Sequence, residues 1–172
     1  MNKAVFLDRD GVLNECEEGK YVNCIAELNV FNYAGRAVKL LNDLNYKVLI
    51  VSNQSGIASG HISVEALSDI NQKLCSCIKN DGGHIDGIYI CPHDKYKNEC
   101  NCRKPKPGLI LQAAKEWDID LSKSWMVGDM VSDINAGISA GVKTILVLSG
   151  LYKMIGVCDE NINFPYKIFN DY

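Results

Sequence analysis

The sequence lacks the features that would place it at a membrane, on nucleic acid or outside the cell. Its apolar runs are too short to cross a bilayer. A formal net charge of −3 gives it no basic surface for nucleic acid. Its N-terminus leads straight into a short apolar stretch and has no signal-peptide pattern. We therefore expect a cytoplasmic protein that binds neither nucleic acid nor membranes.

The chain also has no internal repeat and no low-complexity linker. Its 172 residues are enough for one domain with its own core, and its hydrophobic fraction of 47% is ordinary for a globular protein. We expect a single domain over residues 1–172, and a monomer.

Cysteine, in contrast, is abundant, with eight residues in the chain. Three of them cluster with His93, and their chemistry is considered below. Without a secretory signal, we interpret the other five as ordinary thiols and not as a disulfide framework. These five scattered residues are Cys16, Cys24, Cys75, Cys77 and Cys158.

Short apolar runs alternate with segments of helical periodicity along the chain. The apolar runs predict strands at residues 3–7, 47–51, 87–90, 125–127 and 143–148. Helical spacing predicts helices at 34–44, 63–79, 108–117 and 132–140. This alternation favours an α/β fold, a Rossmann-like three-layer sandwich whose mostly parallel sheet is covered on both faces. We expect the strand order 5-4-1-2-3, whereas residues 151–172 are too weakly patterned to predict an element.

Polar side chains follow three of the predicted strands. Asp8 and Asp10 come after the first strand, Ser52 and Asn53 after the second, and Asp129 after the fourth. Ligands of parallel sheets bind outside the carboxyl ends of the strands, near the point where the strand order reverses. In the order 5-4-1-2-3, the first and fourth strands are neighbours at that point. Asp8 and Asp129 are therefore expected to share one metal ion.

The acidic residues suit phosphoryl transfer, which needs an in-line nucleophile, a proton for the leaving oxygen and compensation of negative charge. Asp8 is the candidate nucleophile, forming an aspartyl-phosphate, and Asp10 the candidate acid and base. The carboxylates of Asp8 and Asp129 and the backbone carbonyl of Asp10 suit Mg²⁺. A solvated acidic turn is the alternative for the Asp-x-Asp pair, and a helix cap is the favoured interpretation of Asp133.

A second group of residues is suited to hold phosphate. Ser52 offers a hydroxyl, Asn53 an amide, Lys104 a cation and Arg103 a planar fork of donors. The alternatives are an ordinary Ser/Asn turn and a solvated basic surface. The predicted catalytic residues are Asp8, Asp10, Ser52 and Lys104. The predicted substrate-binding residues are Ser52, Asn53, Gln54, Ser55, Arg103 and Lys104.

A loop at 91–107 carries the clustered cysteines. Cys91, His93, Cys100 and Cys102 provide three thiols and one imidazole, which is the ligand set of a closed structural Zn²⁺ site. Such a site has no open position for chemistry, so its role would be to hold the following basic pair at the rim of the active site. Incidental cysteines are the alternative.

Four segments together resemble the haloacid dehalogenase (HAD) superfamily of phosphatases, and more closely its D-glycero-D-manno-heptose 1,7-bisphosphate 7-phosphatases. The resemblance runs from about residue 4 to about residue 150. The segments are Asp8-Arg9-Asp10-Gly11, Ser52 to Ile57, Cys91-Pro92-His93 with Cys100 to Pro105, and Val127-Gly128-Asp129. The resemblance implies a capless, magnesium-dependent enzyme that hydrolyses a small sugar phosphate. The roles that it implies for Asp8, Asp10, Ser52, Arg103, Lys104 and Asp129 agree with those above.

The sequence departs from that group at two positions. Ser52 stands where the heptose enzymes often have Thr, and Met130 where they often have Lys, which removes a cation near the substrate. A histidinol-phosphate phosphatase is the main alternative, but that group tends to carry an acidic residue in place of Ser55. A non-catalytic binding protein on the same fold is a further alternative. A nucleic-acid 3′-phosphatase is disfavoured by the charge of the chain.

Overall fold

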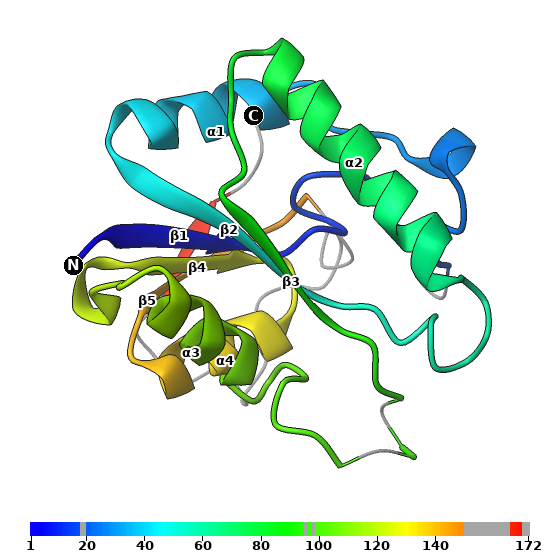
Figure 1. The fold of residues 1–172 in the computed structure, drawn as a ribbon. Coiled ribbons are helices and arrows are strands. Elements are labelled where there is room, and N and C mark those ends of the chain that lie inside the picture. The colour runs from blue at the N-terminus through cyan, green and yellow to red at the C-terminus, as the bar shows by residue number, and fades with distance from the viewer. Residues whose placement is uncertain (18–19, 95, 98, 150–165, 170–172) are drawn as a thin grey trace.

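The computed structural model describes residues 1–17, 20–94, 96–97, 99–149 and the strand at 166–169 (Figure 1). Its core is a parallel sheet in the order β3-β2-β1-β4-β5-β6. The strands are β1 (Lys3–Leu7), β2 (Tyr46–Asn53), β3 (Gly87–Cys91), β4 (Trp125–Gly128), β5 (Lys143–Val147) and β6 (Tyr166–Phe169). The predicted order of the first five strands is confirmed.

Two details of the sheet differ from the prediction. The segment 151–172, for which no element was predicted, contributes β6, which pairs with β5 at the sheet edge. Strand β2 also runs to Asn53 and does not end at residue 51, because its pairing with β3 continues through Ser52↔Ile90 and Asn53↔Cys91. Ser52 and Asn53 therefore lie on the end of a strand and not in a turn.

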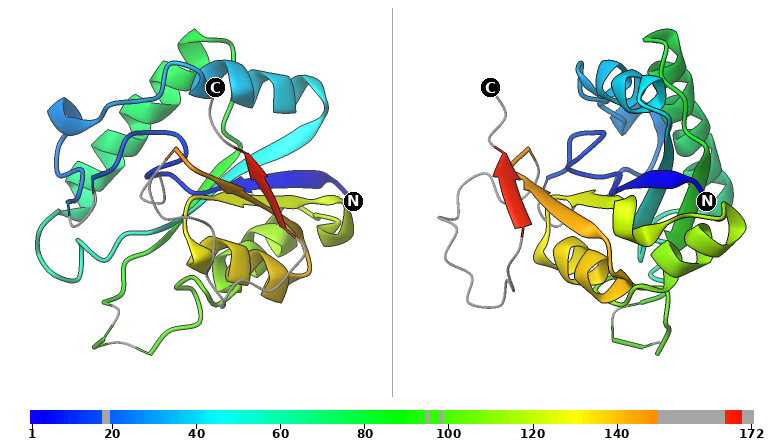
Figure 2. Two further views of the ribbon diagram at one scale, coloured as in Figure 1. Left: turned by 180° about the vertical axis from the view of Figure 1, so that it is seen from behind. Right: turned by 90° about the vertical axis from the view of Figure 1, so that its left-hand side faces the viewer.

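Helices cover the sheet on both faces, as the predicted three-layer sandwich requires (Figures 1 and 2). Helices α1 and α2 pack together on one face, and α3 and α4 on the other. Their bounds are Ala34–Asp43 for α1, Val64–Asn80 for α2, Gly108–Glu116 for α3 and Val131–Ala140 for α4. Two short 3₁₀ helices, Ile25–Glu27 and Leu121–Lys123, lie in the connections.

Alternation along the central strands divides the apolar residues between two cores. On β1, Ala4 and Phe6 face α3 and α4, whereas Val5 and Leu7 face α1 and α2. Because both faces are covered, the strands are apolar throughout, which is the pattern that predicted a parallel sheet. Burial on both sides fixes the register of β1, and with it the position of Asp8 at the strand end.

Two helix termini have recognisable capping residues. Ser63 caps α2, and its Oγ accepts a hydrogen bond of 3.0 Å from the Ala66 N–H. Gly141 ends α4 in the left-handed conformation at φ 81°, which glycine adopts without steric cost. Among the described residues, none of the helices combines the length and apolar character that a bilayer span requires.

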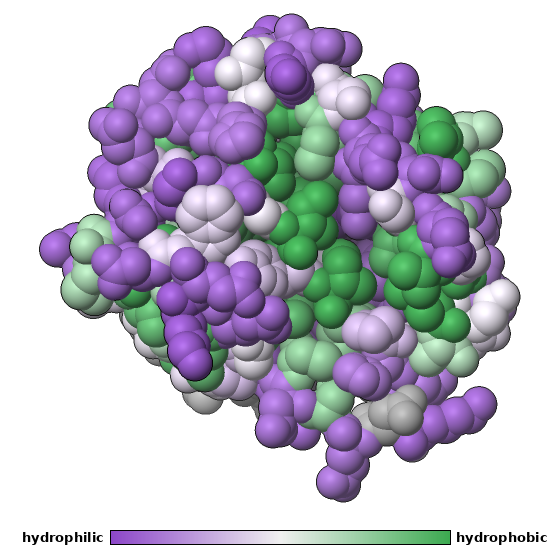
Figure 3. All heavy atoms as spheres, viewed as in Figure 1, coloured by the Kyte–Doolittle hydropathy of each residue, from purple (hydrophilic) through white to green (hydrophobic). Residues whose placement is uncertain are grey.

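Strand β3 forms one edge of the sheet, with a groove on each side of it. The first groove lies against α3, has a volume of about 620 Å³ and is lined by Tyr89, Leu109 and Trp117, among others. Figure 3 shows apolar side chains gathered near the middle of this face, with polar residues around them.

The groove on the α2 side measures about 520 Å³ and is lined by Ile57, Leu67 and Ile90, among others. A pocket of about 580 Å³ lies elsewhere, beside residues 15–29, and is described with the site below.

Candidate active site

The predicted acidic residues meet at the carboxyl ends of β1 and β4. The register Leu7↔Val127 places Asp8 beside the end of β4, and the Asp8 N–H donates to the Val127 carbonyl at 3.0 Å. Carboxylate oxygens of Asp8, Asp129 and Asp133 all lie within 4.8 Å of one another, and all three residues are buried. The strand register thus brings together side chains that are more than 120 positions apart.

Lys104 reaches this group from the loop between β3 and α3. Its Nζ lies 2.9 Å from Asp8 Oδ2 and 2.6 Å from Asp133 Oδ1, and it donates to the Val51 carbonyl at 2.8 Å. Burial alone would lower the pKa of Lys104, but Asp133 and Asp8 outweigh it and raise that pKa above its ordinary value. Lys104 is therefore a buried cation.

Asp133 has two contacts at once. Its carboxylate accepts a hydrogen bond of 3.0 Å from the Met130 N–H, as a residue near a helix N-terminus does, and it also pairs with Lys104. Burial raises the pKa of Asp133 to about 6, although Lys104 opposes the rise. The helix-capping interpretation thus describes one of its two contacts.

The donor set of this cluster suits a divalent cation. Three buried carboxylates face one buried ammonium group, so the cluster carries more negative than positive charge. Buried charges are costly unless they are paired or bound to a metal. Oxygen ligands of this kind are those that Mg²⁺ prefers.

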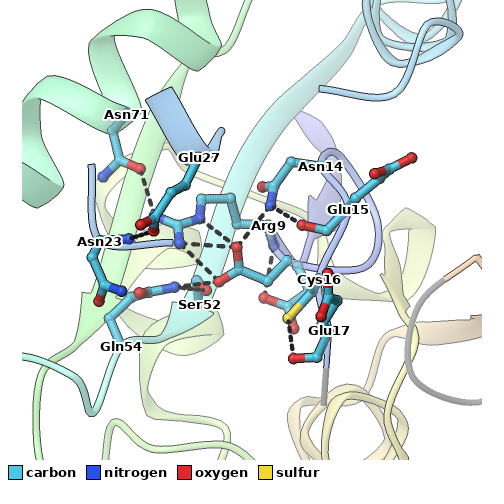
Figure 4. A network of polar contacts seen from close by, with 12 residues as sticks. Arg9, Asn14, Glu15, Cys16, Glu17, Asn23, Glu27, Ser52, Gln54 and Asn71 are labelled. Carbon is cyan, nitrogen blue, oxygen red and sulfur yellow. Dashed lines mark hydrogen bonds and ion pairs between the residues drawn. The ribbon is translucent and has the colours of Figure 1, made fainter. Parts of the chain in front are cut away.

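Asp10 follows Asp8 by two residues, and a network of polar contacts around Arg9 holds its side chain (Figure 4). The Arg9 guanidinium donates to both of its carboxylate oxygens, at 2.8 to 3.1 Å. Asn14 Nδ2 donates to Asp10 Oδ1 at 2.9 Å, and Gln54 Nε2 donates to Asp10 Oδ2 at 2.7 Å. The orientation of Asp10 is thus set by three neighbouring side chains.

The residues expected to bind phosphate or substrate have different surroundings. Ser52 is buried, and its Oγ accepts a hydrogen bond of 3.0 Å from Gln54. The amide of Asn53 pairs with the backbone N–H and carbonyl of Lys104, both at 3.1 Å. Ser55 lies further out, with its hydroxyl 3.4 Å from that of Tyr21. Asn53 and Gln54 therefore position other site residues, and their binding of substrate stays a prediction.

The cysteine-rich loop brings its four predicted ligands together. The ligand atoms of Cys91, His93, Cys100 and Cys102 lie within 4.8 Å of one another, and four of their separations are 3.2 to 3.7 Å. Tetrahedral zinc with Zn–S bonds of about 2.3 Å holds its sulfurs about 3.8 Å apart. The three thiols and the imidazole fit such an ion.

The same loop positions Arg103. Its Nη1 donates to the His93 carbonyl at 3.2 Å, so the guanidinium is tied directly to a residue of the cysteine cluster. Burial opposes ionisation of the Cys100 thiol, but a hydrogen bond from the Arg103 backbone N–H helps to lower its pKa below the ordinary value. None of the described cysteines forms a disulfide, and Cys158, the last of the five scattered cysteines, lies outside the described residues.

A pocket of about 580 Å³ opens beside the acidic residues. Its lining comes from residues 15–17, 20–23, 27 and 29 and from His61, and includes Glu15, Cys16 and Tyr21. Burial raises the pKa of Cys16 to about 11, and the charges of Asp10, Asp129 and Asp8 add to the rise. This pocket therefore lies within electrostatic reach of the carboxylates.

Sequence reasoning did not find the buried partners of Asp10. Arg9 was named only as part of the Asp8-Arg9-Asp10-Gly11 segment and was given no role, yet its side chain is fully buried. Its position between two acids at a strand end was the available signal. Asn71 was also missed, although it is a polar residue on the buried face of α2, next to Ile70.

Comparisons with known proteins agree with this geometry. Residues 101–161 match a family model described as HAD-hydrolase-like. The D-glycero-beta-D-manno-heptose-1,7-bisphosphate 7-phosphatase of Haemophilus ducreyi is 43% identical over 155 residues, covering 86% of this chain and 84% of the relative. The enzyme of the same name from Helicobacter pylori strain 26695 is 45% identical over 148 residues, with the same coverage.

The chain belongs to the heptose-bisphosphate phosphatase family of the HAD superfamily. The resemblance inferred from the four sequence segments is thus confirmed.

A solved structure of this family has the same fold. The D,D-heptose 1,7-bisphosphate phosphatase of B. bronchiseptica, complexed with magnesium and phosphate, aligns with a TM-score of 0.86 and 30% identity. The alignment covers 97% of this chain and 92% of that one. The HAD fold therefore extends over nearly the whole chain.

Proposed function

We propose that this protein is a magnesium-dependent phosphatase that removes the 7-phosphate of D-glycero-D-manno-heptose 1,7-bisphosphate. The observation that carries the proposal is the buried cluster of Asp8, Asp129, Asp133 and Lys104 at the carboxyl ends of β1 and β4. The names of the relatives at 43% and 45% identity support the sugar phosphate as substrate.

In the first step, a carboxylate oxygen of Asp8 attacks phosphorus while the bond from phosphorus to the sugar oxygen breaks. Asp10 gives its proton to that sugar oxygen, which leaves as an alcohol. In the second step, water attacks the aspartyl-phosphate and Asp10 takes a proton from it. Inorganic phosphate leaves, and the Asp8 carboxylate and the Asp10 acid are restored.

Asp8 and Asp129, with the Asp10 carbonyl, would hold Mg²⁺. When bound, Mg²⁺ compensates the charge of the phosphoryl oxygens. Asp133 holds Lys104 through a contact of 2.6 Å, so that the ammonium group stays beside Asp8. Lys104 and the Ser52 hydroxyl would bind the transferred phosphoryl group, and Arg103 would contact the rest of the substrate.

We further propose that Cys91, His93, Cys100 and Cys102 hold a structural Zn²⁺. Their close approach supports this, and so does the hydrogen bond between Arg103 and the His93 carbonyl. The ion would fix the loop that carries Arg103 and Lys104. It would take no part in bond breaking, because four protein ligands leave no open position.

A side-by-side kinetic comparison of heptose 1,7-bisphosphate and histidinol phosphate tests the proposed activity. We expect magnesium-dependent phosphate release, with a higher kcat/KM for the heptose bisphosphate, that Asp8→Asn abolishes. A preference for histidinol phosphate would contradict the proposed substrate. Full activity of the Asp8→Asn variant would contradict the nucleophile.

A further inference from the structure

Arg9 is buried deeply for a charged side chain, with no exposed surface. Its Nε lies 3.1 Å from Asp10 Oδ1, and its Nη2 lies 2.9 Å from Oδ1 and 2.8 Å from Oδ2. Among the described residues, Arg9 thus makes three of the five side-chain hydrogen bonds to Asp10. A planar guanidinium that holds both oxygens fixes the plane of the carboxylate as well as its position.

The other end of the guanidinium is anchored to helix α2. Arg9 Nη1 donates to Asn71 Oδ1 at 3.2 Å, and Asn71 is itself buried on α2. Figure 4 shows Arg9 extending from Asn71 toward the carboxylate that Asn14 and Gln54 also approach. The direction of the Asp10 carboxylate is therefore set from a helix more than 60 positions away.

Gln54 relates this carboxylate to the phosphate-binding side of the site. Its Nε2 donates to Asp10 Oδ2 at 2.7 Å and to Ser52 Oγ at 3.0 Å. Asp10 is thus held on one side by Arg9 and on the other by the amide that contacts Ser52. Such a network defines where the acid stands relative to a bound phosphoryl group.

We propose that Arg9 is a positioning residue that aims Asp10 at the leaving oxygen of the substrate. The proposal rests on the phosphatase function proposed above. Proton transfer requires the acid within hydrogen-bond reach and in the correct direction, whereas attack by Asp8 does not depend on that direction. Weakening the Arg9 contact should therefore slow the release of poor leaving groups more than that of good ones.

The substitution Arg9→Lys tests this, since it keeps the buried positive charge and removes the planar fork. Phenyl phosphate and p-nitrophenyl phosphate are matched in shape, but p-nitrophenolate leaves readily without a proton. General acid catalysis contributes about 10²–10⁴-fold. We expect kcat/KM to fall at least about tenfold more for phenyl phosphate than for p-nitrophenyl phosphate.

A double-mutant cycle separates an effect through Asp10 from a general one. In an Asp10→Asn background, Arg9→Lys should cause little further loss with phenyl phosphate, because the acid that Arg9 orients is already gone. Losses that multiply in the double mutant would overturn the proposal.

Two other variants make the test independent of the folding of Arg9→Lys. Asn71→Leu removes the anchor without touching Asp10, and should shift the same ratio of kcat/KM values in the same direction. Ser124→Ala is the control, because Ser124 is also buried and hydrogen-bonded, to Ala4 and Asp120, but lies away from the site. It should leave the ratio unchanged.

The outcomes distinguish this inference from the proposed function. Wild-type protein that releases no phosphate from the heptose bisphosphate or from either aryl ester would overturn the phosphatase function, and this inference with it. Active wild-type protein whose Arg9→Lys and Asn71→Leu variants lose both aryl esters equally would overturn the inference alone.

Discussion

Lys104 is a buried cation that is stabilised by the negative groups around it. It is 3% exposed and lies within 3 Å of two carboxylates and a backbone carbonyl. Removing one partner from a buried ion pair leaves the others uncompensated, which typically costs about 3–5 kcal/mol. The same ammonium group is the proposed ligand of the phosphoryl oxygens, so its loss should affect stability and activity together.

We therefore predict that Lys104→Met lowers the free energy of unfolding in metal-free buffer by about 3–5 kcal/mol and abolishes phosphate release. Urea denaturation followed by circular dichroism gives the first quantity. Lys115→Met is the matched control, because Lys115 is exposed on α3 and should change stability little. Equal stability of the two variants would show that the contacts of Lys104 contribute no net stabilisation.

At the scale of single elements, the cysteine-rich loop joins a compact ligand cluster to the basic residues of the site. Lys106 Nζ donates to the Cys100 carbonyl at 2.7 Å, and Arg103 donates to the His93 carbonyl at 3.2 Å. The conformation of the loop is thus coupled to the direction of two cations. Metal binding of this kind contributes directly to the folding of the segment that holds the ion.

We predict that the protein contains one zinc per chain by metal analysis and that Cys100→Ser loses it. Without the ion, the loop that carries Arg103 would no longer be held in place. KM for the sugar phosphate should therefore rise more than kcat falls. Cys75→Ser is the control, since Cys75 lies on α2 outside the cluster. Full zinc content and unchanged KM in the Cys100→Ser variant would contradict the structural site.

The elements were predictable where apolar periodicity is strong. The five strands of the predicted order and the four helices follow from runs such as Val48 to Val51, whose burial on both faces leaves the strand uniformly apolar. Strand β6 was missed because it is a four-residue edge strand in a weakly patterned segment. The end of β2 was misplaced because its last pairs depend on β3, which the local sequence does not reveal.

The site was predictable only in part, and the reason is again long-range contact. Asp8 and Asp129 were chosen from their chemistry and from their places after strands. Lys104 was chosen as a cation directly after the cysteine cluster, and the structure brings the three residues together. The contact between Arg9 and Asn71 depends on how α2 packs over the sheet. Local sequence patterns do not show how a helix packs over a sheet. The side-chain contacts that hold Asp10 were therefore visible only in the structure.

For the whole molecule, the sheet topology decides where the chemistry lies. Strands β1 and β4 are neighbours because the chain crosses from β3 back to the other side of β1. That reversal places Asp8 and Asp129 side by side and leaves room above the strand ends. The single domain, the monomeric state and the cytoplasmic location stay predictions from the sequence.

The excess negative charge of the acidic cluster at the ends of β1 and β4 should make the stability of the whole fold depend on magnesium. Folding assembles Asp8, Asp129 and Asp133 into one buried group, and the unfolded chain has no such site. A ligand that binds only the folded state raises the free energy of unfolding by about 2.7 kcal/mol at 100 times its Kd. We predict that Mg²⁺ raises Tm by several degrees in proportion.

The Asp129→Asn variant should lose most of this magnesium-dependent rise in Tm, because it removes one carboxylate from the shared site. Asp43→Asn provides the matched control, since Asp43 is an exposed residue of α1 that pairs with Lys39. Thermal unfolding at constant ionic strength, with sodium replacing magnesium, excludes general salt screening. If wild type and Asp129→Asn respond equally to Mg²⁺, the ion binds elsewhere on the protein, because a site built on Asp129 cannot survive the loss of its charge unchanged.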